Sequence, residues 1–539
     1  MKWTSQQEQA ITDRGRSVIV SAAAGSGKTA VLVERLLQLL ANTDAETRIR
    51  AEDIIVVTFT NDAAAQMKQR LYTALNDAMN ALGSEVDEEQ YSWLLQQQSA
   101  LANANISTIN AFCFNLIREN ADLCDVSSQF RVAEPAQESI YVQNALQSVL
   151  DRWSRTRSDA IEQLFDFFCT RSDEELEHVI LSVADYMKSL AFPEYWVERA
   201  MAVCGDMETV FSRIRHSICT ELAQVLELID KAAPFAQRAY LGKGNNKFTE
   251  RLNEDRENIL FHYNFLRTME MERILDNPLV HTYDFPKFPA IRKDVDTDSK
   301  IVFQQFREIY KKKYKAAVKH FLKPLHFLQG DITVQSTIIP ILLELTQDYR
   351  QTLFEEKRQH NVLSFDDGER LALSLLGRMS ADGRIERTEL GEMLSNRYSL
   401  VMVDEYQDCN NKQDCLFKLL SRGCTATEAG LRYGENAFLV GDVKQSIYSF
   451  RQANPRNFMA ALHDSTPLAE CQKGDIARIY LNQNFRSSKG VIDFVNALFH
   501  MLMAQDCGEV TYDENVEYLL VTVIEEDGTF KVSDCKVKE

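Results

Sequence analysis

The chain has 539 residues, of which 45% are hydrophobic and 26% charged, and its formal net charge is −19. This composition predicts a soluble, folded protein with about three or four domains. The negative charge argues against a protein that coats nucleic acid by bulk electrostatic attraction, but it allows a local basic channel. Eleven cysteines without a Cys-x-x-Cys pair and a polar N-terminus predict a cytoplasmic protein without a zinc centre, an iron–sulfur centre or a membrane span.

A glycine-bearing stretch follows an apolar run at residues 18–20 and precedes an apolar helical pattern at residues 31–37. Strand, glycine loop and buried helix are the layout in which backbone N–H groups bind phosphate oxygens. Lys28 would reach the β- and γ-phosphates, and the Thr29 hydroxyl would bind Mg²⁺. An ordinary strand–turn–helix is the alternative, and both flanks argue against it. The predicted nucleotide-binding residues are Ala22, Ala23, Ala24, Gly25, Ser26, Gly27, Lys28 and Thr29.

Three further stretches before residue 120 have polar or aromatic residues at sites where a ligand could bind. Gln7 precedes the loop and could pair with the N6/N7 edge of adenine, although a solvated glutamine on a helix face is the alternative. Residues 54–58 form a predicted strand that ends in Phe59 and leads into a helix at residues 62–81. Residues 106–113 repeat that arrangement. Such strand ends lie on the ligand-binding rim of a parallel sheet.

Residues 121–361 have long helical patterns and few strand signals, which predicts a helical insertion into the α/β domain. One helix, from Arg307 to Lys323, has basic residues on one side and an apolar stripe of Phe306, Tyr310, Tyr314, Ala317 and Phe321 on the other. The basic side could follow a phosphate backbone or could simply be solvated.

The α/β pattern resumes with a buried strand at residues 400–403, which ends in Asp404 and Glu405. Asp404 could hold Mg²⁺ through water, and Glu405 could orient and deprotonate an attacking water. After the next strand, at residues 437–440, Gln445 is placed to sense a γ-phosphate. Tyr448 and Phe450 follow in a polar loop, where they could stack on unpaired bases or pack in a core.

A last strand at residues 479–481 leads into Phe485 and Arg486. Phe485 could stack on adenine. Arg486 could stabilise charge on a transferred phosphoryl group, as an arginine finger does. The predicted catalytic set is therefore Lys28, Asp404, Glu405, Gln445 and Arg486.

Taken in order, these stretches resemble the motifs of superfamily 1 DNA helicases of the UvrD/Rep/RecB type. The matching segments are residues 4–11, 22–29, 58–64, 404–408, 441–451 and 484–487. Within that superfamily the chain is most similar to the AddA (RexA) family of helicase–nuclease subunits. The resemblance implies ATP- and Mg²⁺-driven 3′→5′ translocation on single-stranded DNA in the resection of duplex DNA ends. It also implies a heterodimer with an AddB or RexB partner.

The resemblance further implies contacts with single-stranded DNA by Phe59, Asn61, Tyr448 and Phe450. Asn110 stands where the family usually has a histidine, which weakens the same assignment there, although asparagine can still hydrogen-bond to DNA. The implied fold is a RecA-like P-loop domain with a large helical insertion and the start of a second RecA-like domain. The implied domains are 1A in residues 1–118 and 362–475, the helical accessory domain 1B in residues 119–361, and the beginning of domain 2A in residues 476–539.

The later helicase motifs and a carboxylate-rich nuclease segment are not found in this sequence. We therefore expect the chain to be the N-terminal part of a longer helicase, which alone binds nucleotide but hydrolyses it slowly. A stand-alone repair helicase of the UvrD type is one alternative, and an ATP-gated DNA-binding scaffold is another. A small-molecule kinase is least compatible, because Phe59, Tyr448 and Phe450 would have no role in it.

Overall fold

The computed structural model describes residues 3–42, 44, 47–82, 88–268, 283–288, 294–319, 325–427, 430–448, 450, 452–503, 519–524 and 530–533. The chain divides into two compact units. Residues 1–149, 181–195 and 348–539 form the sheet unit, and residues 150–180 and 196–347 form the helical unit. No helix among the described residues is both long enough and apolar enough to cross a lipid bilayer.

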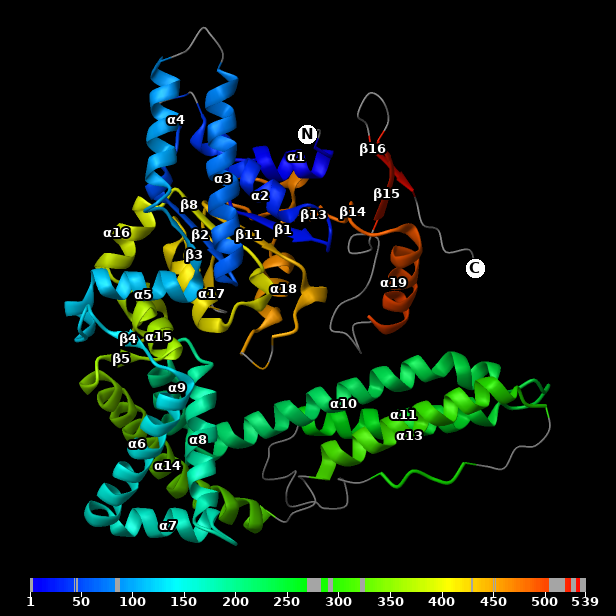
Figure 1. The fold of residues 1–539 in the computed structure, drawn as a ribbon. Helices are drawn as coiled ribbons and strands as arrows, with labels where there is room; N and C mark the ends of the chain where they lie inside the picture. Colours follow the sequence, from blue (N-terminus) through cyan, green and yellow to red (C-terminus); the bar gives the residue numbers. More distant parts are fainter. Residues whose placement is uncertain are drawn as a thin grey trace. The chain divides into compact units, whose positions relative to one another are not determined.

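The sheet unit is built on seven parallel strands in the order β12-β13-β1-β11-β8-β2-β3 (Figure 1). Four central strands are buried at every residue, because their valine, isoleucine and leucine side chains are covered on both faces. The predicted α/β fold with a parallel sheet flanked by helices is thus confirmed. The strands are β1 (Val18–Ala22), β2 (Ile54–Thr58), β3 (Asn105–Thr108), β8 (Leu400–Val403), β11 (Ala437–Gly441), β12 (Thr466–Pro467) and β13 (Ala477–Leu481).

Alternate residues of the four central strands enter two separate cores, one on each face of the sheet. The first core packs against α1 (Ser5–Thr12), α2 (Lys28–Leu40), α3 (Asn61–Ala81) and α4 (Glu88–Ala100). The second packs against α5 (Ile109–Glu119), α15 (Phe365–Leu376), α16 (Glu389–Arg397), α17 (Asn411–Leu420) and α18 (Pro455–His463). In β1, for example, Val18 and Val20 face the first core and Ile19 faces the second.

Short strands outside the main sheet connect segments that are distant in sequence. β4 (Arg131–Val132) pairs with β5 (Val362–Leu363), which brings the two ends of the predicted helical insertion side by side. The other short strands are β6 (Gly377–Met379), β7 (Ile385–Arg387), β9 (Thr425–Thr427), β10 (Gly430–Arg432), β14 (Gln483–Asn484), β15 (Leu519–Ile524) and β16 (Phe530–Ser533). They form two hairpins and a three-stranded sheet, and α19 (Lys489–Leu502) lies between β14 and β15 in the chain.

The predicted boundary between residues 475 and 476 lies just before β13. β13 follows that boundary, yet it pairs with β1 along its whole length. The main sheet therefore extends to Leu481, because the hydrogen-bonding partner of a strand is set by tertiary folding and not by its own residues. The predicted domain boundaries stay predictions.

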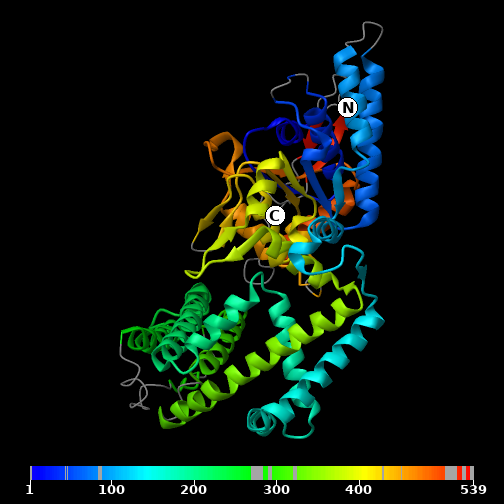
Figure 2. The ribbon, with the colours of Figure 1, turned by 90° about the vertical axis from the view of Figure 1, so that its left-hand side faces the viewer.

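The helical unit contains a bundle in which α10 (Met207–Arg238) packs against both α11 (Lys247–Thr268) and α13 (Thr297–Val318) (Figures 1 and 2). Its core is aliphatic and aromatic and includes Leu222, Ile259 and Phe303. Among the described residues, the other helices of the insertion are α6 (Pro135–Thr156), α7 (Ser158–Phe168), α8 (Glu174–Lys188), α9 (Pro193–Val203) and α14 (Leu325–Gln359).

The predicted basic helix is α13, and one of its basic residues lies on the apolar side. Tyr310, Tyr314 and Ala317 are buried, as the predicted stripe requires, but Arg307 is buried with them at 5% exposure. Arg307 binds the fully buried Asp255 of α11, with 2.8 Å between Arg307 Nε and Asp255 Oδ2. Arg307 is therefore not part of a solvated basic face. Phe321 and Lys323 lie outside the described residues.

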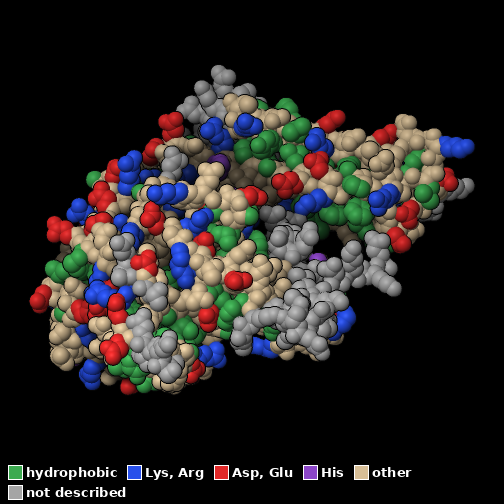
Figure 3. Space-filling view, turned by 90° about the horizontal axis from the view of Figure 1, so that it is seen from above, with side chains coloured by type: hydrophobic (Ala, Val, Ile, Leu, Met, Phe, Trp, Pro, Cys, Tyr) green, Lys and Arg blue, Asp and Glu red, His purple; other side chains and the backbone are tan. Residues whose placement is uncertain are grey.

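Acidic and basic side chains are interspersed over the face of the molecule drawn in Figure 3. Binding of an anion on this face would depend on particular side chains rather than on a broad field of one sign.

Candidate functional site

The predicted phosphate loop connects the end of β1 to the start of α2, at the C-terminal edge of the main sheet. Gly25 and Gly27 have φ angles of +75° and +80°, in the left-handed region that glycine adopts without strain. A Cβ atom on Gly25 would lie 2.9 Å from Asn484 Nδ2, and one on Gly27 would lie 3.2 Å from Gln7 Nε2. The two glycines let the loop backbone approach the N-terminal helix and the segment after β13.

Replacing Gly25 with alanine should impair the loop more than replacing Gly15. Both glycines have positive φ, +75° and +77°, so each variant incurs about 1–2 kcal/mol of backbone strain. Only Gly25 lacks space, because nothing lies within 4 Å of a Cβ atom on Gly15. We expect Gly25→Ala to lower both the melting temperature and the nucleotide affinity, whereas Gly15→Ala should leave nucleotide affinity unchanged. Equal effects of the two variants on affinity would contradict this prediction.

The loop lysine meets the second predicted carboxylate. Lys28 Nζ lies 3.2 Å from both carboxylate oxygens of Glu405. Glu405 has a φ of +52°, a strained conformation for a residue other than glycine and one that clusters at functional sites. Its backbone N–H donates a 3.0 Å hydrogen bond to Oδ1 of Asp404, the residue that directly follows β8.

Asp404, like Glu405, is partly buried. Its burial, and then the charge of Glu405, raises the pKa of Asp404 to about 6, while Lys28 opposes the shift. A cation beside Asp404 would stabilise its ionised form. A carboxylate and the Thr29 hydroxyl are oxygen donors of the kind that Mg²⁺ prefers, so the donor chemistry fits this ion.

Gln407 and Asp442 connect Glu405 to Gln445, and sequence reasoning missed both connecting residues. Gln407 Nε2 donates to Glu405 Oε2 at 2.9 Å, and Gln407 Oε1 accepts a 2.9 Å hydrogen bond from the Asp442 N–H. Gln445 Nε2 donates to Asp442 Oδ2 at 2.8 Å. The structure therefore joins Gln445, Glu405 and Lys28 in one network. Both missed residues lie in recognised motifs, but spacing alone does not show which polar side chains turn toward Glu405.

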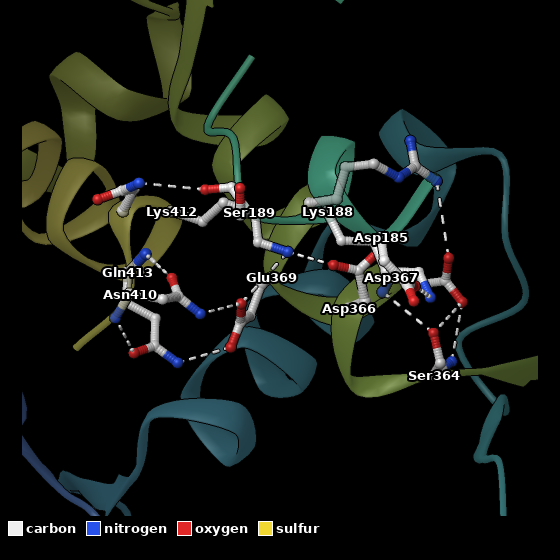
Figure 4. A network of polar contacts seen from close by, with 12 residues as sticks. Asp185, Lys188, Ser189, Ser364, Asp366, Asp367, Glu369, Asn410, Lys412 and Gln413 are labelled. Carbon is white, nitrogen blue, oxygen red and sulfur yellow. Dashed lines mark hydrogen bonds and ion pairs between the residues drawn. The ribbon is translucent and has the colours of Figure 1, made fainter. Parts of the chain in front are cut away.

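The segment after Glu405 is held by a buried polar network between α15 and the start of α17 (Figure 4). Lys412, whose side chain is 4% exposed, forms ion pairs with Asp366 and Glu369. Glu369 also accepts hydrogen bonds from Asn410 Nδ2 at 2.9 Å and from Gln413 Nε2 at 2.6 Å. Because each buried charge has a partner, the network fixes the backbone that follows the two strand-end carboxylates.

The two residues predicted to hold adenine line one small hollow, together with Ser26 and Tyr480. Gln7 is only 6% exposed, so the alternative of a solvated glutamine was wrong. Its Nε2 donates to the Ser26 carbonyl at 3.0 Å. Phe485 is 43% exposed, and its N–H donates to the Gly25 carbonyl at 3.0 Å. Adenine binding in this hollow stays a prediction.

Asn484, another residue that sequence reasoning did not single out, ties the segment after β13 to the phosphate loop. Its Nδ2 donates to the Ala24 carbonyl, and its Oδ1 accepts from the Arg486 N–H, both at 2.8 Å. Arg486 is thereby placed beside the loop with an exposed side chain. The guanidinium of Arg486 makes no hydrogen bond or ion pair with the described residues, so its assignment as an arginine finger stays a prediction.

Three residues predicted to contact DNA form one aromatic cluster. The ring centroids of Phe59 and Tyr448 lie 4.6 Å apart, and those of Tyr448 and Phe450 lie 5.8 Å apart. Phe450 is 75% exposed. Asn61 is the first residue of α3 and Asn110 is the second residue of α5. These helices follow β2 and β3, which are adjacent strands, so both asparagines lie along the same sheet edge. Contact of these residues with DNA is not tested by the structure and stays a prediction.

Comparisons with known proteins agree with this arrangement. The family described as UvrD/REP helicase N-terminal domain matches residues 3–466. The chain is 31% identical over 533 residues to an ATP-dependent helicase/nuclease subunit of Oceanobacillus iheyensis, with 96% of this chain and 41% of that protein covered. It is 32% identical over 526 residues to the protein of the same name from Listeria welshimeri, with 96% and 41% covered.

A third relative with that name, from Acetivibrio thermocellus, is 31% identical over 527 residues, with 95% of this chain and 40% of that protein covered. The chain thus spans about two-fifths of the length of the curated relatives it matches. The family match covers most of the chain and includes the phosphate loop, the paired carboxylates and Gln445. The chain therefore belongs to the UvrD/REP helicase family and contains its N-terminal domain.

Proposed function

We propose that the chain is the N-terminal motor part of an ATP-dependent 3′→5′ DNA helicase. In this proposal the whole protein works with an AddB- or RexB-type partner, in a heterodimer, in the resection of double-strand DNA ends. Three relatives carry the name of an ATP-dependent helicase/nuclease subunit, which supports this assignment over a stand-alone helicase. The observation that most directly supports the proposal is the network that joins Lys28, Glu405 and Gln445 at the edge of a parallel sheet.

In the proposed mechanism, backbone N–H groups of residues 25–29 and the Lys28 ammonium bind the phosphates of ATP. Thr29 and Asp404 would hold Mg²⁺, which would neutralise charge on the phosphate oxygens. Glu405 would accept a proton from the attacking water. Before this step, on ATP binding, the contact of Glu405 with Lys28 would give way to a contact between Lys28 and phosphate.

Gln445 would couple events at the γ-phosphate of ATP to DNA binding. Its amide is hydrogen-bonded to Asp442, and the segment that contains both also contains the aromatic cluster of Tyr448 and Phe450. A change at the γ-phosphate could thereby shift rings that stack on bases. Arg486 would add positive charge beside the transferred phosphoryl group once the rest of the motor is in place.

The first test is ATP turnover by this chain with and without single-stranded DNA, with Lys28→Ala as the inactive comparison. We expect nucleotide binding that depends on Lys28, and slow turnover that DNA stimulates. DNA-stimulated turnover that Lys28→Ala abolishes would support the motor assignment. Nucleotide binding with DNA binding but no turnover in the full-length protein would instead favour an ATP-gated scaffold. No nucleotide binding at all would refute the proposal.

Phe450→Ala should weaken binding of single-stranded DNA by about 5- to 150-fold, because stacking of one base on an aromatic ring contributes about 1–3 kcal/mol. Phe494→Ala is the matched control, since Phe494 is similarly exposed at 68% but lies on α19, outside the aromatic cluster. The measurement is fluorescence anisotropy with a labelled oligothymidine. Equal affinities of the two variants would remove Phe450 from the proposed DNA contact.

A further inference from the structure

A cavity of about 430 Å³ lies at the end of the main sheet opposite to the phosphate loop. It is lined by Leu400 and Ala437, which are the first residues of β8 and β11. The phosphate loop follows the last residue of β1, a parallel strand of five residues that spans about 17 Å. A small molecule in this cavity would therefore not contact the phosphate loop.

Four arginines line this cavity, namely Arg14, Arg16, Arg35 and Arg422, and we call it the arginine cavity. Glu435 is the acidic residue among its lining, so the wall has an excess of positive charge. Arg14 and Arg422 donate to backbone carbonyl oxygens, and within the described part of the chain neither has an ion pair. Arg16 has a carboxylate partner, Asp13, at 3.7 Å.

Arg35 is the most buried of the four, at 4% exposure. Its Nη1 donates to the Ala10 carbonyl at 2.8 Å, and its guanidinium carbon lies 4.2 Å from the centre of the Phe438 ring. Its Nε is buried and has no hydrogen-bond partner among the described residues. Burial lowers the pKa of Arg35 to about 9, with the charge of Arg14 as the second cause. The carboxylate of Asp13 opposes this shift but forms no ion pair with Arg35 among the described residues, and a buried charge without a paired anion is unfavourable.

We propose that the arginine cavity binds a small anion that carries two or more phosphate groups. Guanidinium groups suit phosphate because they donate parallel pairs of N–H bonds, which a lysine cannot do. The volume is in the range of small-ligand sites, and the aliphatic side chains of Leu39, Ile49 and Leu400 leave space for a neutral part of the ligand. The proposal does not depend on ATP binding at the phosphate loop.

The test is isothermal titration of the 539-residue chain with inorganic tripolyphosphate, without Mg²⁺, at about 0.15 M salt. The Lys28→Ala variant reports on the cavity alone, and we expect it to bind one equivalent at millimolar or lower concentration. In that background, Arg14→Gln/Arg422→Gln should weaken binding at least about tenfold, since hydrogen bonds between charged groups are lost. Arg378→Gln/Arg384→Gln is the matched control, because both residues are exposed on the β6–β7 hairpin.

The proposal is overturned if the Lys28→Ala chain does not bind tripolyphosphate, or if the two double variants bind it equally well. Circular dichroism shows whether the Arg14→Gln/Arg422→Gln chain is folded. If it is not folded, the Arg16→Gln variant decides. Arg16 lies in the cavity wall, and among the described residues it has only the 3.7 Å contact with Asp13 and one 3.4 Å hydrogen bond to a carbonyl. An unchanged affinity in Arg16→Gln would then refute the site.

Discussion

Glu405→Gln should lower the rate of ATP hydrolysis by about 10²–10⁴-fold, the usual contribution of a general base. Glutamine keeps the shape of the side chain and can still contact Lys28 and Gln407, but it cannot accept a proton from water. Nucleotide affinity should change only a few-fold, since the phosphate loop and Lys28 remain. The measurement is single-turnover hydrolysis with protein in excess over ATP, which resolves slow rates.

Glu389→Gln is the control for this variant, because Glu389 is an exposed residue in the first turn of α16. Its turnover should equal that of the unaltered chain. If Glu405→Gln hydrolyses ATP at the unaltered rate, Glu405 is not the base. If it fails to bind nucleotide at all, the Lys28–Glu405 contact is a structural support of the loop rather than a resting position of the base.

Asp255→Ala should destabilise the bundle of α10, α11 and α13 by about 3–5 kcal/mol, because it leaves the charge of Arg307 buried without a partner. Besides Arg307, the Asp255 carboxylate accepts hydrogen bonds from Tyr310 Oη at 2.7 Å and Tyr283 Oη at 2.8 Å. Hydrogen exchange measured by mass spectrometry should show amides of the bundle exchanging roughly 10²–10³-fold faster. Amides of α2 and α17 in the sheet unit should be unaffected.

Asp230→Ala is the matched control, since Asp230 also forms an ion pair between α10 and α11. Its Oδ1 lies 3.0 Å from Arg256 Nε, but the two side chains are 61% and 43% exposed. An exposed pair contributes about 0–1 kcal/mol, so exchange should change less than about fivefold. Similar exchange rates in the two variants would show that the buried Asp255 pair stabilises the bundle no more than the exposed Asp230 pair does.

The sequence predicts the strands and loops of the site well, because their signals are local. An apolar strand, two glycines and Lys28 identify a phosphate loop without reference to any other segment. The same holds for the strand-end carboxylates Asp404 and Glu405. The basic helix was less predictable, since helical spacing distinguishes two faces but does not reveal that Asp255 of another helix lies against the apolar face and pairs with Arg307.

What the sequence alone determined is the chemistry available to this protein: the family, the parallel α/β fold and the side chains at each strand end. The tertiary structure decided which of them meet. It brought Lys28 to Glu405 and joined Glu405 to Gln445 through Gln407 and Asp442. It also brought Arg422 to a cavity that Arg14, Arg16 and Arg35 line. Strand pairing and the burial of side chains create these contacts, and both depend on residues hundreds of positions apart, which no local pattern encodes.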